Sequence, residues 1–197
     1  ASMTVSSRRL SKYAVAVHIA GGLALACLDR ISPVGMFGVG GRDLREEPSL
    51  SQEQIHQWLH RLRTFRYDEP TLLSQRLSRL SPSLDSSSLI VVLSDLHDDQ
   101  ALGVLKLLGQ RHDVVVIQLQ DPAEADLRGA GLVRAQEAET GYEFVTHGRA
   151  AWLDQQFVEQ ELKRAGIDHV LVRTDEPFSY RLRYFFQSRG IIGKGTR

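Results

Sequence analysis

The sequence predicts an α/β protein with a mostly parallel sheet that is covered by helices on both faces. Three mostly apolar runs, at 88–95, 113–120 and 168–174, have the length and composition of buried strands. Amphipathic helical patterns lie between them at 99–112 and 149–166. Strands that alternate with helices favour parallel pairing, because each helix returns the chain to the end of the sheet at which the previous strand began.

The amino-terminal half supplies further elements in chain order. A helix is expected at 11–30, with Ser11 as its N-cap and an apolar middle suited to packing against a sheet. A short glycine-rich strand should follow at 34–41. Two more helices are expected at 51–66 and 70–80.

The carboxyl-terminal half adds a small β-hairpin near 131–146, because "ETGY" supplies turn chemistry between two extended runs. Gly166 should end the helix that begins at 149, and a last helix is expected at 177–189. The sequence shows no linker, so we predict one domain over 1–190 and a flexible tail over 191–197.

Composition excludes several classes of protein. Basic and acidic residues both number 24, and this balance argues against a nucleic-acid binder. The single cysteine, Cys27, allows no internal disulfide and fits a reducing compartment. The apolar stretch 13–28 is shorter than the ~20 residues that a bilayer span needs. We therefore expect a cytoplasmic chain with no membrane segment.

The strongest candidate site is "LIVVLSDLHDD", 89–99, where Asp95 directly follows a buried strand. Ligands in open α/β sheets bind at the carboxyl ends of the strands. A simpler interpretation is that Ser94, Asp98 or Asp99 caps the next helix. A third is a metal-dependent hydrolase that uses Asp95, His97 and the two later aspartates around two metal ions.

Other motifs have simple structural explanations. His56 and His60 have the spacing of a zinc-protease helix, but Gln57 stands where the catalytic glutamate should be. The glycines at 38–41 lack the spacing of a nucleotide-binding loop and fit close strand packing. Cys27 reads as an inert core thiol.

The order of several segments resembles a known family. It starts with "ASM" and the "SSRRLSKYAVAVHIAGGLALACLDRISPVGMFGVGG" that follows at 6–41, and continues with "SD" (94–95), "HDV" (112–114), "DPAE" (121–124) and "AETG" (138–141). Over roughly 1–190 the chain is similar to the von Willebrand factor A-like domain of the bacterial family of unknown function numbered fifty-eight.

That resemblance implies a metal-ion-dependent adhesion site. Carried over residue by residue, Asp95 would supply the aspartate of the third loop, Ser2 the second serine of the first loop, and Thr71 the threonine of the second loop. Hard oxygen ligands of this kind suit Mg²⁺ or Mn²⁺, with one position left for a partner's carboxylate.

The chain departs from the family pattern at its start. The aspartate and first serine of the D-x-S-x-S motif, and the strand that presents them, would precede Ala1. Either the sequence starts inside the motif, an upstream start lies beyond it, or Ala1 and Ser2 match it by chance. We expect the metal site to be incomplete, so the chain should bind metal poorly, rearrange its sheet, or form a homodimer through exposed strand edges.

The resemblance implies a non-enzymatic protein-interaction or adaptor domain that works with a MoxR-type AAA+ ATPase in complex assembly. The alternative from the residues themselves is the metal-dependent hydrolase built on the "SDLHDD" cluster.

Overall fold

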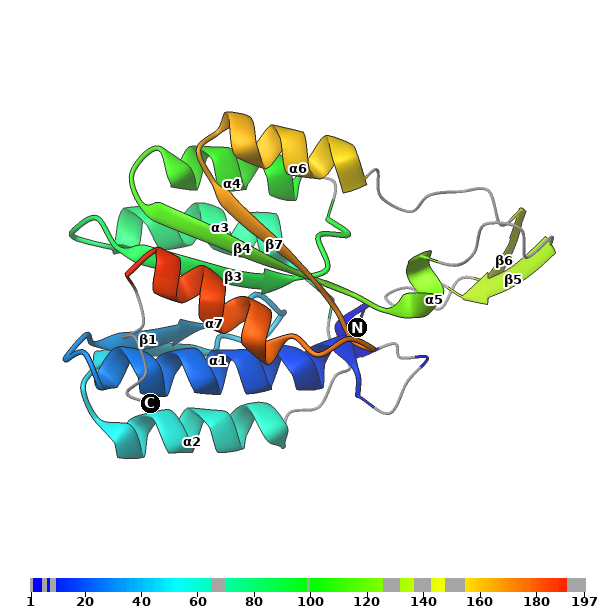
Figure 1. Ribbon diagram of the computed structural model, residues 1–197. Coiled ribbons are helices and arrows are strands. Elements are labelled where there is room, and N and C mark those ends of the chain that lie inside the picture. Colours follow the sequence, from blue (N-terminus) through cyan, green and yellow to red (C-terminus); the bar gives the residue numbers. More distant parts are fainter. Residues whose placement is uncertain are drawn as a thin grey trace.

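The computed structural model describes residues 2–4, 7, 10–64, 70–98, 100–125, 132–136, 143–147 and 155–190. Its centre is a parallel three-stranded sheet in the order β3 (Leu89–Ser94), β4 (Asp113–Gln120) and β7 (Asp168–Arg173) (Figure 1). The three apolar runs of the sequence are therefore confirmed as parallel neighbours.

Two antiparallel pairs accompany this sheet. Strand β1 (Val34–Phe37) pairs with β2 (Arg45–Ser49), and β5 (Leu132–Gln136) pairs with β6 (Glu143–His147). The second pair confirms the predicted hairpin strands. The "ETGY" turn between them and the predicted tail at 191–197 lie outside the described residues.

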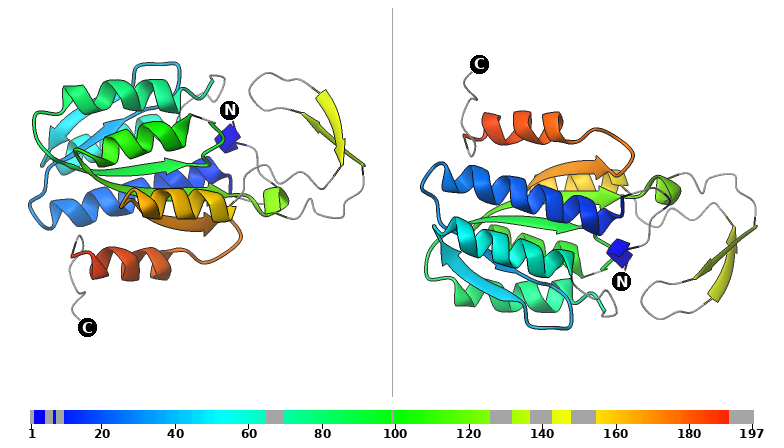
Figure 2. Two further views of the ribbon diagram at one scale, coloured as in Figure 1. Left: turned by 90° about the horizontal axis from the view of Figure 1, so that it is seen from above. Right: turned by 90° about the horizontal axis from the view of Figure 1, so that it is seen from below.

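The helices cover both faces of the central sheet, as predicted (Figure 2). They are α1 (Lys12–Leu28), α2 (Gln52–Arg63), α3 (Leu73–Leu80), α4 (Ala101–Gly109), α5 (Pro122–Ala125), α6 (Gln155–Arg164) and α7 (Ser179–Ser188), with 3₁₀ turns η1 (Ser2–Thr4) and η2 (Ser81–Ser83). Helices α3, α4 and α6 pack on one face, and α1 and α7 on the other. Helix α2 packs against α1 and β1.

Strand β4 is the most deeply buried part of the sheet. Val114 and Val116 point into the core below α3 and α4, whereas Val115, Ile117 and Leu119 point toward α1 and α7. Successive side chains of a strand face opposite sides, so a strand covered on both faces is apolar at most positions. The run from Val114 to Ile117 follows from this central place, and the buried Gln118 beyond it is hydrogen-bonded to Gln155 and His169.

Strand β3 is less buried than the sequence predicts. Within the described part of the chain it pairs only with β4, so it forms one edge of the central sheet. Leu89 at its start is 38% exposed, and Ile90, Val91 and Leu93 are half-buried. An apolar strand with one unpaired edge is suited to pairing with another extended segment.

The sequence did not predict β2. Its residues, "REEPS", are mostly charged and include Pro48, a composition that β-propensity disfavours. Two glycines let β1 approach it. A Cβ on Gly35 would lie 2.7 Å from the Glu46 carbonyl oxygen, and one on Gly38 would lie 2.9 Å from the Leu44 Cβ. Close strand packing therefore explains Gly35 and Gly38.

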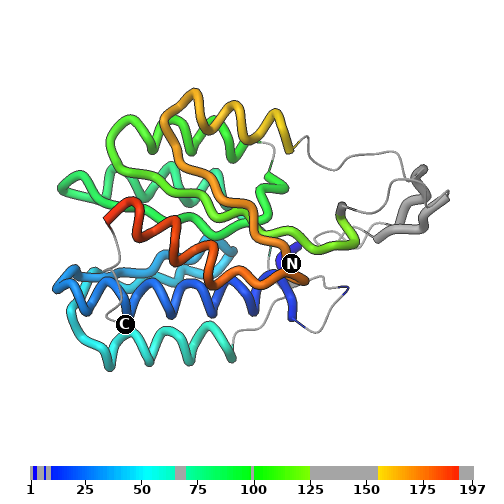
Figure 3. The backbone as a smooth tube through the Cα atoms, in the orientation of Figure 1, coloured from blue at the N-terminus to red at the C-terminus, as the bar shows by residue number. Residues whose placement is uncertain are grey.

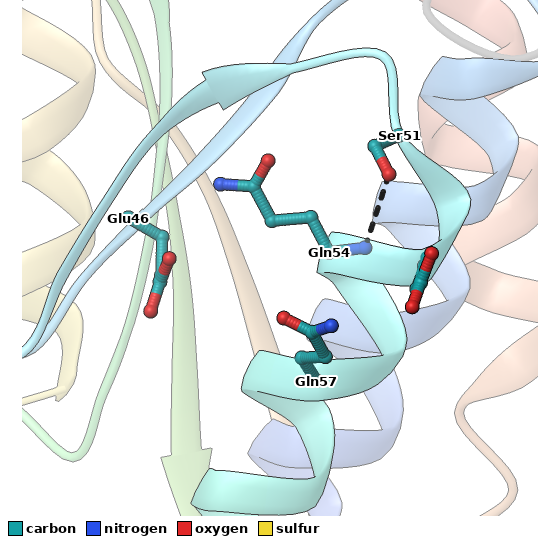
Figure 4. Close-up of a pocket in the computed structure, with 5 residues that line it drawn as sticks. Glu46, Ser51, Gln54 and Gln57 are labelled. Carbon is teal, nitrogen blue, oxygen red and sulfur yellow. Dashed lines mark hydrogen bonds between the residues drawn. The ribbon is translucent and has the colours of Figure 1, made fainter.

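Serine hydroxyls cap the starts of α1 and α2, and the predicted N-cap Ser11 is confirmed. The Ser11 hydroxyl accepts a hydrogen bond from the Ala14 amide at 3.1 Å. Ser51 caps α2 by accepting from the Gln54 amide at 3.2 Å (Figure 4). The Gln54 side chain does not complete a capping box, because it donates instead to the Glu47 carbonyl at 3.5 Å. The stretch 13–28 lies inside α1, and none of the helices in the described ranges is long and apolar enough to cross a bilayer.

Candidate functional site

Asp95 and Lys12 form a buried ion pair at the carboxyl end of β3. Asp95 follows the last residue of that strand and is 3% exposed. Lys12 is the first residue of α1 and is fully buried. Its ammonium donates to Asp95 Oδ2 at 2.9 Å and also to Glu124 Oε1. Helical side chains lean toward the amino end of their helix, so Lys12 projects past the start of α1 into this site.

Glu124 belongs to α5, directly after β4. The backbone amide of Asp121 donates to Glu124 Oε2 at 3.1 Å, and the Glu124 amide donates to the Asp121 carbonyl at 3.0 Å. These two bonds fold α5 back so that the other Glu124 oxygen faces Lys12. The carboxyl ends of β3 and β4 thus contribute one carboxylate each.

Asp121 anchors the amino-terminal segment beside this site. Its carboxylate accepts from the Ser7 amide at 2.9 Å and from the Ser7 hydroxyl, and also from the Ala123 amide at 2.9 Å. Burial alone would raise the pKa of Asp121, but the hydrogen bonds from Ser7 and Ala123 and the charge of Lys12 hold that pKa below its ordinary value. Figure 3 shows the amino-terminal segment at this end of the sheet.

His97 also faces the two carboxylates. Its Nδ1 lies 3.5 Å from Asp95 Oδ2, and its Nε2 lies 4.0 Å from Glu124 Oε1. The turn between Asp95 and His97 passes through Leu96, which is buried in the left-handed region at φ 58° and donates its amide to Ser94 Oγ at 3.0 Å. His97 lies in the loop after β3 and is exposed, and this turn directs its ring toward Asp95 and Glu124.

The Asp95 carboxyl is held in its ionised form. Burial on its own raises the pKa of Asp95, but the charges of His97 and Lys12, the hydrogen bond from Lys12 and the nearby Ser2 hydroxyl together lower that pKa below its ordinary value. The result is a permanent negative charge in the interior, compensated by nearby cationic groups.

Ser2 lies in η1 beside this cluster. Its side chain is 9% exposed, and its Oγ is buried without a hydrogen bond of normal geometry. The hydroxyl nevertheless lies close enough to Asp95 to favour the charged form of that carboxyl. A buried hydroxyl that lacks a well-formed hydrogen bond is unusual in a folded protein.

Thr71 and Asp98 take other positions. Thr71 precedes α3 and forms an isolated β-bridge with Gly40. Asp98 accepts from the amide of Ser74, in the first turn of α3, at 2.9 Å and from that of Gln100 at 2.9 Å. It therefore caps α3 and not the helix that follows it, because the N-cap residue of α4 is Gln100 and carries no side-chain cap. Asp99 lies outside the described residues. The structure therefore brings Ser2 close to Asp95 and places Thr71 directly before α3.

The donor set fits a metal ion in part. One possible ligand atom from each of Asp95, His97 and Glu124 lies within 4.8 Å of the others, and the Ser2 hydroxyl adds a fourth oxygen or nitrogen donor nearby. Carboxylate and hydroxyl oxygens suit Mg²⁺ and Mn²⁺, and an imidazole suits the softer divalent ions. The Lys12 ammonium, however, already occupies one oxygen of each carboxylate.

Two members of this site, Lys12 and Glu124, escaped the sequence-based prediction. The signal for Glu124 was present, because it follows the end of β4 at the same distance in sequence as Asp98 follows the end of β3. The signal for Lys12 was a single charge directly after an N-cap serine, at the start of an otherwise apolar helix. Such a charge has to find a partner when its helix is buried.

A second, shallow hollow lies on the opposite side of α1, between β2 and α2 (Figure 4). It is lined by Glu46, Ser51, Glu53, Gln54 and Gln57. Glu46 is already paired with Arg61, and Ser51 caps α2. Cys27 is half-buried, and burial raises the pKa of its thiol although Arg30 opposes the shift. Neither feature offers reactive chemistry.

One comparison with known proteins gives a match. A family model described as "Protein of unknown function DUF58" matches residues 1–165. Neither the curated proteins nor the solved structures contain a significant match.

Proposed function

The chain belongs to the DUF58 family, and from this premise we propose that it is a non-enzymatic protein-interaction domain with a von Willebrand factor A-like fold. In this proposal it acts as an adaptor, and a divalent cation at Asp95 assists the contact with its partner. The family model covers most of the chain, including every residue of the site around Asp95.

The observation that carries the proposal is the buried, ionised Asp95 at the carboxyl end of β3, with Glu124 beside it. Ligands of open α/β sheets bind at the carboxyl ends of the strands. Ser2 adds a hydroxyl with no well-formed hydrogen bond, and this supports a role as an oxygen ligand. The charge and the oxygen donors suit Mg²⁺ or Mn²⁺.

In this proposal Asp95, Ser2 and Glu124 hold the cation, and Thr71 approaches from the segment before α3. The bound cation offers an open position to a carboxylate of a partner protein. The resemblance of the sequence suggests a MoxR-type AAA+ ATPase as that partner.

The experiment is a titration with Mn²⁺, followed by the electron paramagnetic resonance signal of the unbound ion. The natural chain is compared with Asp95→Asn and with Asp85→Asn, a matched change at an exposed aspartate. We expect binding that Asp95→Asn abolishes and Asp85→Asn leaves intact. Binding that survives Asp95→Asn would remove the cation from the proposal.

Partner binding is tested separately. A MoxR-type ATPase is immobilised, and retention of the chain is measured with Mg²⁺ and with a chelator. We expect retention that requires both Mg²⁺ and Asp95. Retention that is equal in both buffers would argue for an adaptor without a cation, and no retention at all would argue against this class of partner.

The hydrolase alternative has less support. Both oxygens of Asp98 accept backbone amides, so this residue is engaged in capping α3. A two-metal centre also needs several carboxylates, and Lys12 already pairs with Asp95 and Glu124. The position of His97 toward Asp95 is the one feature in its favour. Metal-dependent cleavage of a generic phosphate ester that Asp95→Asn abolishes would revive it.

A further inference from the structure

We propose that Lys12 is a built-in cation that competes with a divalent metal ion for Asp95 and Glu124. In this view the side chain of Lys12 holds the site closed, and a metal ion enters only when that side chain swings out. The inference deepens the proposed function, since it rests on the same cation site and names what regulates it.

The ammonium of Lys12 lies between the carboxylates that would bind the metal ion. The Lys12 ammonium contacts one oxygen of each carboxylate, and Asp95 Oδ2, which accepts from Lys12 at 2.9 Å, is also the oxygen that faces His97 at 3.5 Å. A cation that binds Asp95 through this oxygen therefore meets the ammonium directly.

The charges make simultaneous occupancy unfavourable. Without counting His97, two carboxylates and one ammonium leave a single negative charge, and Lys12 and Asp95 lie in the interior of the protein. A divalent ion added beside the ammonium would reverse that sign and leave positive charge without a partner, which is costly in a buried site. Replacing the ammonium by the divalent ion instead leaves the two carboxylates neutralised.

The position of Lys12 in the fold permits the exchange. It is the first residue of α1, after the N-cap Ser11, so its long side chain extends beyond the helix and its movement breaks no helical hydrogen bond. The start of α1 remains as a partial positive charge near Asp95. A site that is open in only 0.1–10% of molecules binds its ligand about 10- to 1000-fold more weakly than one that is always open.

The test compares Mn²⁺ affinity in the natural chain and in Lys12→Met, which removes the charge and keeps most of the side-chain volume. We expect Lys12→Met to bind Mn²⁺ about 10- to 1000-fold more tightly. Adding Asp95→Asn to Lys12→Met should abolish this gain. Lys106→Met, which breaks a lysine–glutamate pair far from the site, is the matched control and should leave the affinity unchanged.

The outcomes separate this inference from the proposed function. Equal, Asp95-dependent affinity in the natural chain and in Lys12→Met overturns the competition and leaves the cation site standing. Binding in Lys12→Met but none in the natural chain supports the competition and removes the cation from the natural function. Absence of binding in both chains overturns both proposals.

A second measurement uses the natural chain alone, in case Lys12→Met does not fold. The buried Lys12 ammonium should give a protected ¹⁵N signal in nuclear magnetic resonance spectra. Saturation with Mg²⁺ should abolish that signal or move it to the position of a solvated lysine. The change in the signal should have the same midpoint Mg²⁺ concentration as metal binding. Binding of Mg²⁺ while the signal stays unchanged would contradict the competition.

Discussion

The ammonium of Lys12 and the carboxylate of Asp95, 83 positions apart in the sequence, meet at 2.9 Å in the interior of the protein. Their side chains are 0% and 2% exposed, so neither charge is screened by solvent. Removing one partner of such a pair strands the other charge, at a cost of about 3–5 kcal/mol.

A double-mutant cycle tests this coupling. Lys12→Met and Asp95→Asn should each lower the free energy of unfolding by about 3–5 kcal/mol. The double variant should lose less than the sum, because neither charge then remains without its partner. Urea unfolding followed by circular dichroism provides the measurement. Strictly additive losses would mean that the two residues act independently.

The end of α1 contains a strained residue whose replacement should stabilise the protein. Ile31 has a left-handed backbone at φ 56° and is 80% exposed. The Ser32 amide donates to the Cys27 carbonyl at 3.0 Å, and the Ile31 amide donates to the Leu28 carbonyl at 2.8 Å. This is the Schellman pattern, in which glycine is preferred at the left-handed position.

Ile31→Gly should therefore raise the free energy of unfolding by about 1 kcal/mol. Ile31→Ala is the control, because it removes the branched side chain but keeps the strained Cβ, and it should gain less. Thermal unfolding measures both variants. A lower melting temperature for Ile31→Gly would show that the Ile31 side chain contributes more than its strain costs.

His169 should make stability depend on pH. Burial lowers the pKa of this imidazole below its ordinary value; Glu159 opposes the shift and Arg181 adds to it. The ring nitrogen Nε2 lies 2.9 Å from Gln118 Oε1, which also accepts from Gln155. The folded protein therefore binds a proton at His169 less readily than the unfolded chain does.

The direction of the pH dependence follows from the difference between the pKa values of His169 in the folded and the unfolded chain. The contribution of neutral His169 is complete above the unfolded pKa of about 6.5, and it is lost as the pH falls from there through the lower folded pKa. Urea midpoints measured at a series of pH values from neutral downward should fall less steeply in His169→Gln than in the natural chain. If the urea midpoint changed with pH equally in both chains, His169 would not contribute to the loss of stability at low pH.

Arg189 should stabilise the start of the central sheet. Its Nη2 donates to Asp113 Oδ1 at 2.6 Å, and its Nη1 lies 2.9 Å from Asp168 Oδ2 as an ion pair without hydrogen-bond alignment. These aspartates are the first residues of β4 and β7, and the guanidinium also lies over the Phe185 ring, 5.9 Å from its centroid.

Arg189→Met should lower the free energy of unfolding by about 1 kcal/mol, because both aspartates are half-exposed and solvent screens the pairs. Arg183→Met, at an exposed position of the same helix, should change it much less. Added salt should narrow the difference between the natural chain and Arg189→Met. A difference that is insensitive to salt would assign the effect to the contact with Phe185.

Local sequence patterns predicted the parts of the fold that local physics determines. The apolar run from Val114 to Ile117 in β4 marked a strand covered on both faces, and Ser11 marked the start of α1. Asp95 was placed at the carboxyl end of β3 by the same reasoning. Periodicity and capping act over a few residues, so they can be read from the sequence alone.

The remaining features depend on contacts between distant segments. The start of α3 lacks a local cap and instead receives Asp98 from the loop after β3. Strand β2 exists because β1 lies beside it, since its charged residues have little strand propensity of their own. One partner of Lys12 comes from the loop after β3 and the other from α5, and no local pattern identifies them.

The ion pairs of Lys12 close loops of 83 and 112 positions. Contacts of such long range cost more loop-closure entropy than local ones, so they form later in folding than the helices and turns do. The cluster of Lys12, Asp95 and Glu124 is therefore complete only in the folded protein. A nascent chain whose synthesis has not yet reached Glu124 contains only part of it. Cation binding at Asp95 would thus serve as a direct assay of correct folding, since a misfolded chain would retain the carboxylates but lose their arrangement.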